Sequence, residues 1–221
     1  MRLIFLGPPG AGKGTHAKIL SEKTGAVHLA AGDILRRHIR EQTLLGKKAK
    51  SVIEKGELVS DLLVNQMMGE EIKQIQGSGK TGFILDGYPR TINQAEFLDK
   101  VLKRQKTPLD AALNFVTTED VIVDRLSGRR VCAKCGKNYH VRNIPPKREG
   151  ICDQCGVELM LRKDDQPDTI KNRLKIYRKE TEPLIGYYAK KRILWEVSGD
   201  FDVPELQAQI QGLFENLKLL I

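Results

Sequence analysis

The chain has 221 residues, of which 40% are hydrophobic and 29% charged, and its 37 Lys and Arg against 28 Asp and Glu give a formal net charge of +9. This composition is typical of a globular protein, and no run of about 18 apolar residues predicts a membrane-spanning helix. The positive charge favours polyanionic ligands, which include nucleic acids, anionic membranes and phosphorylated small molecules.

Short apolar runs alternate with helical patterns along the chain. The apolar runs predict buried strands at 2–6, 27–29, 83–86, 111–116 and 193–197. Helical periodicity predicts helices at 13–23, at 33–64 with breaks at Gly46 and Gly56, and at 91–104, 119–126, 168–191 and 204–220. Strands alternating with helices predict an α/β fold, a five-stranded parallel sheet flanked by helices. The first apolar run is too short for the core of a signal peptide, so we expect a cytoplasmic protein.

A glycine-rich segment, GPPGAGKGT at 7–15, follows the first predicted strand and opens the first predicted helix. Gly7, Gly12 and Lys13 match the spacing G-x-x-x-x-G-K of a phosphate-binding loop. Glycines let backbone N–H groups approach phosphate oxygens, the helix N-terminus adds unpaired donors, and the lysine adds a full charge. Gly14 stands where Ser or Thr is usual, and the hydroxyl comes one residue later. A glycine-rich turn with a surface lysine is the alternative, which the flanking strand and helix disfavour.

Four cysteines form two C-x-x-C pairs, Cys132 with Cys135 and Cys152 with Cys155, which sixteen residues separate. This spacing is typical of a zinc site in which two pairs of thiolates complete a tetrahedron. Four protein ligands leave no open position, so the zinc would be structural, in a segment too short for a hydrophobic core. Two disulfides or a redox motif are the alternative, which a cytosolic setting disfavours, and iron fits the same ligands.

Further motifs accompany the phosphate loop and the cysteines. They are GDILR at 32–36, DGYPR at 86–90 with Gln94 after it, DR at 124–125, GRR at 128–130, RKDD at 162–165 and Arg173. Together these segments resemble the adenylate kinases, in the long form that carries a zinc-binding lid with four cysteines. The resemblance covers nearly the whole chain, and DGYPR is its most diagnostic part.

The resemblance implies a P-loop kinase core with two smaller parts. The core would comprise 1–29, 60–127 and 166–221, a helical AMP-binding flap would cover 30–59, and a small zinc-bearing lid would cover 128–165. The implied activity is reversible phosphoryl transfer from MgATP to AMP, giving two ADP, with closure of lid and flap excluding water. The implied cofactors are Mg²⁺, held through water by Asp86, and structural Zn²⁺, and the implied state is a monomer.

The same resemblance assigns substrate contacts residue by residue. It implies ATP contacts at Gly10, Ala11, Gly12, Lys13, Gly14, Thr15, Arg125, Arg129, Asn138 and Tyr139. It implies AMP contacts at Ala31, Arg36, Glu57, Leu58, Val59, Gly87, Tyr88, Pro89, Arg90, Gln94, Arg162 and Arg173. It implies catalytic roles for Lys13, Arg90, Arg125, Arg162 and Arg173.

One position departs from the family pattern. Ala31 stands where the family usually has Thr, whose hydroxyl lies close to the AMP base, and kinases of UMP and CMP often have Ala there. Gln94 and the four-cysteine lid favour AMP. A UMP/CMP-type kinase is therefore the nearest alternative.

A protein of another class, a zinc-knuckle module that binds nucleic acid, would also combine basic residues with paired cysteines. Such a module needs aromatic side chains among its basic residues for base stacking. The segment 128–165 offers only Tyr139. We therefore expect ATP, AMP and ADP as partners, and neither nucleic acid nor a membrane.

Overall fold

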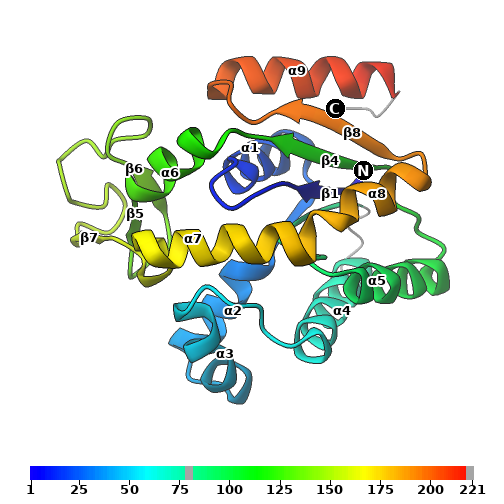
Figure 1. Cartoon of the computed structure of the whole chain (residues 1–221), viewed down its shortest axis with the longest axis horizontal. Helices are drawn as coiled ribbons and strands as arrows, with labels where there is room; N and C mark the ends of the chain where they lie inside the picture. Colours follow the sequence, from blue (N-terminus) through cyan, green and yellow to red (C-terminus); the bar gives the residue numbers. More distant parts are fainter. Residues whose placement is uncertain (78–81, 218–221) are drawn as a thin grey trace.

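The computed structural model describes residues 1–77 and 82–217 and contains the predicted five-stranded parallel sheet (Figure 1). The strand order is β2-β3-β1-β4-β8, and every pair of neighbours is parallel. The strands are β1 Arg2–Leu6, β2 Val27–Ala30, β3 Phe83–Asp86, β4 Ala111–Val116 and β8 Leu194–Ser198. Because all five run the same way, their carboxyl ends and the loops after them meet at one edge of the sheet.

Helices cover both faces of this sheet. On one face α1 (Lys13–Thr24) and α9 (Val203–Asn216) share a buried apolar cluster with β1 and β4. On the other face α4 (Asp61–Gly77), α5 (Ile92–Gln105) and α8 (Pro183–Lys190) pack with β1, β3 and β4 in a second cluster. Strands buried on both faces explain why their sequences are almost continuously apolar.

Two helices, α2 (Ala31–Arg40) and α3 (Leu44–Glu54), form a pair that lies below the sheet in Figure 1. The break predicted at Gly46 exists but lies earlier, at 41–43, and Gly46 itself is in the first turn of α3. The Thr43 hydroxyl caps that turn by accepting the Gly46 N–H at 3.1 Å. Gly46 is there for close packing, since a Cβ at this position would collide with the backbone carbonyl of His38.

The second predicted break, at Gly56, is confirmed. Gly56 follows the end of α3 with a φ of +72°, a left-handed conformation that favours glycine. The residues predicted at the end of that helical stretch belong to α4, which begins at Asp61 and runs to Gly77.

The long helix predicted over 168–191 is divided. It consists of α7 (Pro167–Ile176), a π-helical turn at Tyr177–Thr181, and α8. The side-chain pattern is helical throughout, so the sequence alone did not separate the three parts. The last predicted helix corresponds to α9, which ends at Asn216, and its predicted end lies outside the described residues.

A small antiparallel sheet projects from the main body at the left of Figure 1. Helix α6 (Glu119–Ser127) leads into β5 (Arg129–Cys132), which lies between β6 (Asn138–His140) and β7 (Leu159–Met160). A short 3₁₀ turn, η1 (Lys163–Asp165), returns the chain to α7. Within the described residues, no helix combines the length and the apolar character needed to cross a bilayer.

Candidate active site

A cleft of about 1420 Å³ opens along the carboxyl edge of the main sheet. Its walls come from the phosphate loop, α2, the segment after α3, the loop after β3, the small antiparallel sheet and α7. Every residue for which the sequence predicts a substrate or magnesium contact lines this cleft except Tyr88. Tyr88 is 1% exposed, and its hydroxyl donates to Asn65 Oδ1 at 2.8 Å.

The phosphate loop forms the turn from β1 to α1 that the sequence predicts. Gly7, Gly10 and Gly12 have φ values of +131°, +87° and +89°, a region that other residues rarely adopt. The loop also passes close to β4, since a Cβ on Gly7 would lie 2.7 Å from the Phe115 carbonyl oxygen. The ammonium of Lys13 donates to the carbonyl oxygens of Gly7 and Pro8, at 2.8 and 2.7 Å. The loop therefore curls around its own lysine at the start of α1.

Lys13 is buried, and burial lowers the pKa of its ammonium to about 8, with nearby Arg90 and Arg173 adding to the effect and Asp86 opposing it. An anion placed beside this group would favour its charged form. An anion in the cleft would therefore raise the pKa of Lys13 again.

Asp86 ends β3 and faces Lys13 across the loop. Burial opposes ionisation of this carboxyl, but His28, Lys13 and Arg90 outweigh it and hold the pKa below its usual range. His28 Nε2 lies 3.4 Å from Asp86 Oδ2. A Cβ at Gly14 would lie 3.1 Å from the same oxygen, which gives a physical reason for glycine where related loops have Ser or Thr.

Arg90 follows Asp86 in the loop after β3. Burial lowers the pKa of its guanidinium to about 10, and Arg173 adds to this. Its Nε donates to the Gly87 carbonyl at 2.9 Å, and its backbone N–H donates to Gln94 Oε1 at 2.7 Å. The guanidinium is thus held against its own loop, which fixes its direction.

Two more arginines meet on a shared carboxylate. Arg129 donates to both oxygens of Asp165, from Nε at 2.7 Å and from Nη2 at 2.5 Å. Arg173 donates to Asp165 Oδ1 at 2.8 Å and to the Asp164 carbonyl at 2.9 Å. Asp165 is 1% exposed. A buried carboxylate thus joins the small antiparallel sheet, through Arg129, to α7, through Arg173.

Arg162 and Arg36 approach the same carboxylate, that of Asp33, and both line the cleft. Arg162 Nη2 donates to Asn138 Oδ1 at 2.6 Å and lies 3.8 Å from Asp33 Oδ1. Arg36 Nη2 donates to the same oxygen of Asp33 at 2.5 Å. Burial lowers the pKa of Arg162 to about 9, and the charges of Arg36 and Arg129 add to this. These cations are therefore close enough to repel one another.

Arg125 does not join this group. Its guanidinium donates to the carbonyl oxygens of Gly199 at 2.5 Å and Phe201 at 3.1 Å. The segment 200–204 lines the cleft beside the phosphate loop, and the sequence analysis missed it. Its position directly after the fifth strand was the available signal, since that edge of a parallel sheet carries the binding loops.

Part of the wall near α2 is apolar. Ala31, Leu35 and Val64 line it, and the last two were not predicted as site residues. Gln94 Nε2 donates to Asp61 Oδ1 at 2.7 Å, while its Oε1 accepts the Arg90 N–H. Both ends of the Gln94 amide are therefore oriented by the protein.

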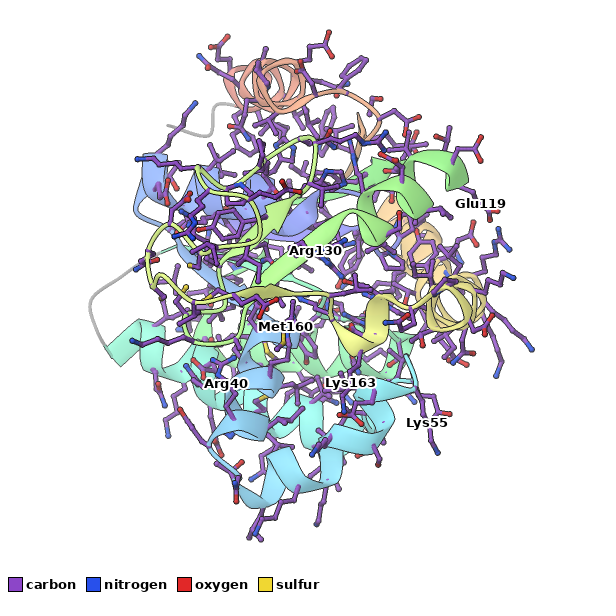
Figure 2. The ribbon with its side chains drawn as sticks, turned by 90° about the vertical axis from the view of Figure 1, so that its left-hand side faces the viewer. Arg40, Lys55, Glu119, Arg130, Met160 and Lys163 are labelled. Atoms are coloured by element: carbon purple, nitrogen blue, oxygen red, sulfur yellow. The ribbon has the colours of Figure 1, made fainter. Side chains whose placement is uncertain are left out.

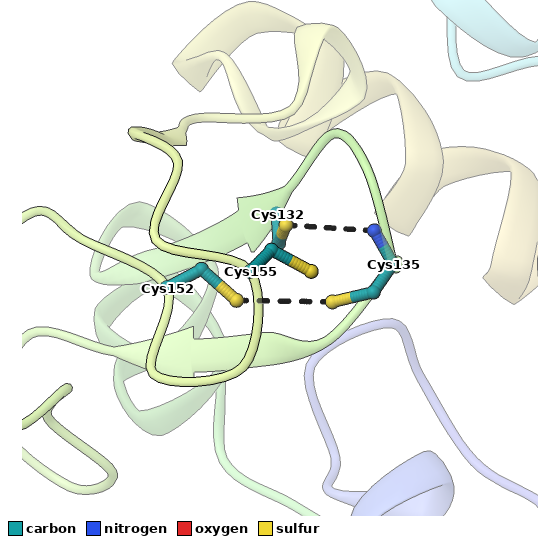
Figure 3. A group of neighbouring side chains, drawn as sticks. All are labelled: Cys132, Cys135, Cys152 and Cys155. Carbon is teal, nitrogen blue, oxygen red and sulfur yellow. Dashed lines mark hydrogen bonds between the residues drawn. The ribbon is translucent and has the colours of Figure 1, made fainter.

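The four cysteines gather at the tip of the small antiparallel sheet (Figure 3). All four thiols are free, and their sulfurs lie within 4.8 Å of one another. Sulfurs around a tetrahedral zinc stand about 3.8 Å apart, given Zn–S bonds of about 2.3 Å, and Cys135 Sγ and Cys152 Sγ are 3.7 Å apart. The sulfur positions fit a four-coordinate metal and do not form the alternative pair of disulfides.

Tyr139 turns toward the cysteines. It is 3% exposed, and its hydroxyl lies 3.5 Å from Cys152 Sγ. The hydroxyl oxygen accepts the Asp153 N–H at 2.9 Å, which leaves its own proton to donate to the sulfur. This hydrogen bond lowers the pKa of the Cys152 thiol and favours the thiolate that binds a metal.

Comparisons with known proteins agree with this geometry. The family model described as adenylate kinase matches residues 5–193. The chain is 50% identical over 215 residues to an adenylate kinase of Thermodesulfovibrio yellowstonii, covering 97% of this chain and 99% of the relative. It is 47% identical over 218 residues to one of Archaeoglobus fulgidus (99% and 100% covered) and 48% over 209 residues to one of Thermotoga neapolitana (94% of each). On this evidence the chain belongs to the adenylate kinase family.

Proposed function

We propose that this chain transfers a phosphoryl group reversibly from MgATP to AMP and so produces two ADP. The observation that carries the proposal is the convergence of Lys13, Arg90, Arg129, Arg162 and Arg173, from separate segments, on one cleft that begins at a phosphate loop. Such a concentration of fixed cations suits two highly charged nucleotides that meet with their phosphates facing each other.

On the donor side, the phosphate loop would hold the ATP phosphates. The backbone N–H groups of 10–15 and the N-terminus of α1 supply donors, and Lys13 supplies a mobile charge. On binding, phosphate oxygens would replace the carbonyls of Gly7 and Pro8 as partners of the lysine. Arg129, Arg125 and the lid residues Asn138 and Tyr139 complete this set, with Tyr139 contributing through its backbone because its side chain faces the cysteines.

On the acceptor side, the apolar wall near α2 would receive the base of AMP. Ala31, the segment 57–59 and the loop 87–90 surround that space, and the oriented amide of Gln94 faces it. Tyr88 supports this loop from beneath. Arg36 and Arg90 would bind the AMP phosphate, and Arg162 and Arg173 would contact both phosphate groups.

The transfer itself asks for positioning and charge neutralisation more than for proton transfer. The AMP phosphate is already ionised, so no general base is needed, and the arginines can follow the negative charge that spreads over the transferred group. Bound phosphates would offset the mutual repulsion of these arginines. The binding energy of the nucleotides is then available to close the protein and exclude water.

Closure would divide the chain into three parts, a core (1–29, 60–127 and 166–221), a flap (30–59) and a lid (128–165). Contacts at the junctions support this division. Lys163 of the lid pairs with Glu54 of the flap at 3.0 Å, and Asn172 of α7 in the core donates to the Lys55 carbonyl of the flap at 2.8 Å. In Figure 2, Lys163 appears close to the flap end that carries Lys55.

Two metal ions belong to the proposal. Asp86, an ionised carboxylate among phosphate-facing groups, would hold Mg²⁺ through water, and that ion would neutralise phosphate charge. The four cysteines would hold structural Zn²⁺, which their sulfur spacing fits. A cytoplasmic location and a monomeric state are further predictions, which rest on the family resemblance.

A coupled assay tests the proposal. The purified protein is given MgATP with AMP, UMP or CMP in turn, and formation of ADP is followed. We expect turnover with AMP at least about tenfold above the other two, a difference of about 1.4 kcal/mol in transition-state stabilisation. Preference for UMP or CMP would assign the chain to the alternative kinase, and no turnover with any monophosphate would reject the proposal.

A further inference from the structure

The π-helical turn Tyr177–Thr181 brings a threonine to the floor of the cleft. A π turn adds one residue to a helical stretch and so changes which side chains face inward after it. Here it stands between α7, which carries Arg173, and α8, which packs in the core. Tyr177 and Thr181 both line the cleft. Thr181 is 8% exposed, so its hydroxyl needs a partner inside the protein.

That partner is the backbone of Arg90. The Thr181 hydroxyl donates to the Arg90 carbonyl oxygen at 2.9 Å, across 91 residues of sequence. In a regular helix a threonine hydroxyl commonly bonds a carbonyl of its own preceding turn. The backbone N–H of Glu182 donates to the Tyr177 carbonyl at 2.9 Å across the π turn, and the hydroxyl points to the neighbouring loop instead.

Arg90 is consequently held on both sides of its peptide unit. Gln94 Oε1 accepts its N–H at 2.7 Å, Thr181 binds its carbonyl, and Gly87 accepts its Nε–H at 2.9 Å. A guanidinium can bind two oxygens of one phosphate only when it is correctly oriented and placed to within a fraction of an ångström. The carbonyl contact fixes the base from which that side chain extends.

We propose that Thr181 is a positioning residue for Arg90, through which it sets the affinity for the monophosphate and the rate of transfer to it. The proposal rests on the proposed function, because it assigns Arg90 to the acceptor phosphate. The Thr181 hydroxyl is engaged by the Arg90 carbonyl, so its role would be exerted through Arg90. The π turn directs the Thr181 hydroxyl toward Arg90. The continuous stretch of α7 and the π turn would therefore position two arginines, Arg173 on the helix itself and Arg90 through Thr181.

The test compares Thr181→Val, which keeps the shape and removes the hydroxyl, with Thr181→Ser, which keeps the hydroxyl. We expect KM for AMP to rise about fivefold in Thr181→Val, the loss typical of one hydrogen bond, while KM for ATP changes less than about twofold. Thr181→Ser should restore wild-type kinetics. Thr24→Val is the matched control, since Thr24 donates to the Leu20 carbonyl in α1 and does not line the cleft.

A double-mutant cycle separates positioning from general loosening of the fold. In an Arg90→Ala background, Thr181→Val should have no further effect on KM for AMP, because the backbone carbonyl remains but the guanidinium that it positions has gone. Thr181→Ala provides a second variant with the same expected shift if Thr181→Val does not fold. An unchanged KM for AMP, an equal rise for ATP, or full additivity with Arg90→Ala would overturn the inference. Absence of wild-type turnover would instead reject the proposed function, so the two failures are distinguishable.

Discussion

The phosphate end of the cleft and the cysteine-bearing sheet differ in how much apolar surface supports them and in how much charge they bury. At the phosphate end, several cations are buried close together, and burial lowers the pKa of Lys13, Arg90 and Arg162. Two large apolar clusters lie beneath them on either face of the main sheet. The cysteine-bearing sheet has a buried cluster of only Cys132, Tyr139, Cys152 and Leu159, with Cys155 and Val157 packed against it.

The difference shows where each region obtains its stability. The main sheet buries enough apolar surface to carry charged groups that oppose folding, and those charges are what a phosphate would bind. The small sheet buries much less apolar surface, so we expect metal ligation to supply much of its stability. Substitutions should therefore separate the two regions: changes at the phosphate end should affect activity more than stability, and changes at the cysteines the reverse.

The largest effect is expected from Lys13→Ala. Turnover with ATP and AMP should fall about 1000-fold, or about 4 kcal/mol of transition-state stabilisation, because no other side chain supplies a charge within the loop. The melting temperature should not fall, since the variant removes a buried charge. Steady-state kinetics and thermal denaturation check both parts, with the exposed Lys23→Ala of the same helix as control. Retention of more than about a tenth of the activity would contradict the assignment of the loop.

Asp165→Asn tests the contact by which Asp165 connects Arg129 of the small sheet to Arg173 of α7. Removing this charge leaves Arg129 and Arg173 facing each other in a buried setting, and we expect the free energy of unfolding to fall by about 3 kcal/mol. Urea denaturation at neutral pH measures the change. Glu149→Gln, an exposed carboxylate in the same part of the chain, should change stability by less than about 0.5 kcal/mol. Equal effects would show that the shared carboxylate does not join the regions.

The pH dependence of stability tests the burial of Lys13. Its pKa in the folded protein is lowered to about 8, below the value of about 10.4 in an unfolded chain. The unfolded state therefore binds more protons between these values, and the cost of the buried charge disappears as pH rises. Relative to Lys13→Met, the wild type should gain about 2 kcal/mol between about pH 7.5 and about pH 9.5. A pH-independent difference would mean that the ammonium is not desolvated.

The smallest effect on the whole protein is expected from Cys132→Ser. The melting temperature should fall by about 5 °C, equivalent to about 1.5 kcal/mol, because the metal would lose one of four ligands. Zinc content, measured by elemental analysis, should fall with it, while turnover should change less than in Lys13→Ala. Met160→Ser, at an exposed position of the same sheet, is the control. Unchanged melting and metal content would reject the metal site.

Sequence-based prediction succeeded where the structure is determined by residues close to one another in the sequence. Apolar runs located the strands of the main sheet, and the phosphate loop lay at the predicted turn with its glycines at positive φ. It misplaced the break assigned to Gly46, a glycine that resembles a helix stop but instead allows α3 to pack closely on α2. It also missed the π turn, because the residues in it have the same helical pattern as their neighbours.

The sequence by itself determined the family, the parallel sheet, the phosphate loop and the two pairs of cysteines, because local spacing and periodicity specify each of them. Only the tertiary structure decided which groups the charged and polar side chains contact. It placed Asp165 between two arginines, turned the Tyr139 hydroxyl to a sulfur, set Arg125 against the loop after β8, and aimed Thr181 at Arg90. These contacts join residues that meet only after the elements pack, so no pattern along the chain could specify them.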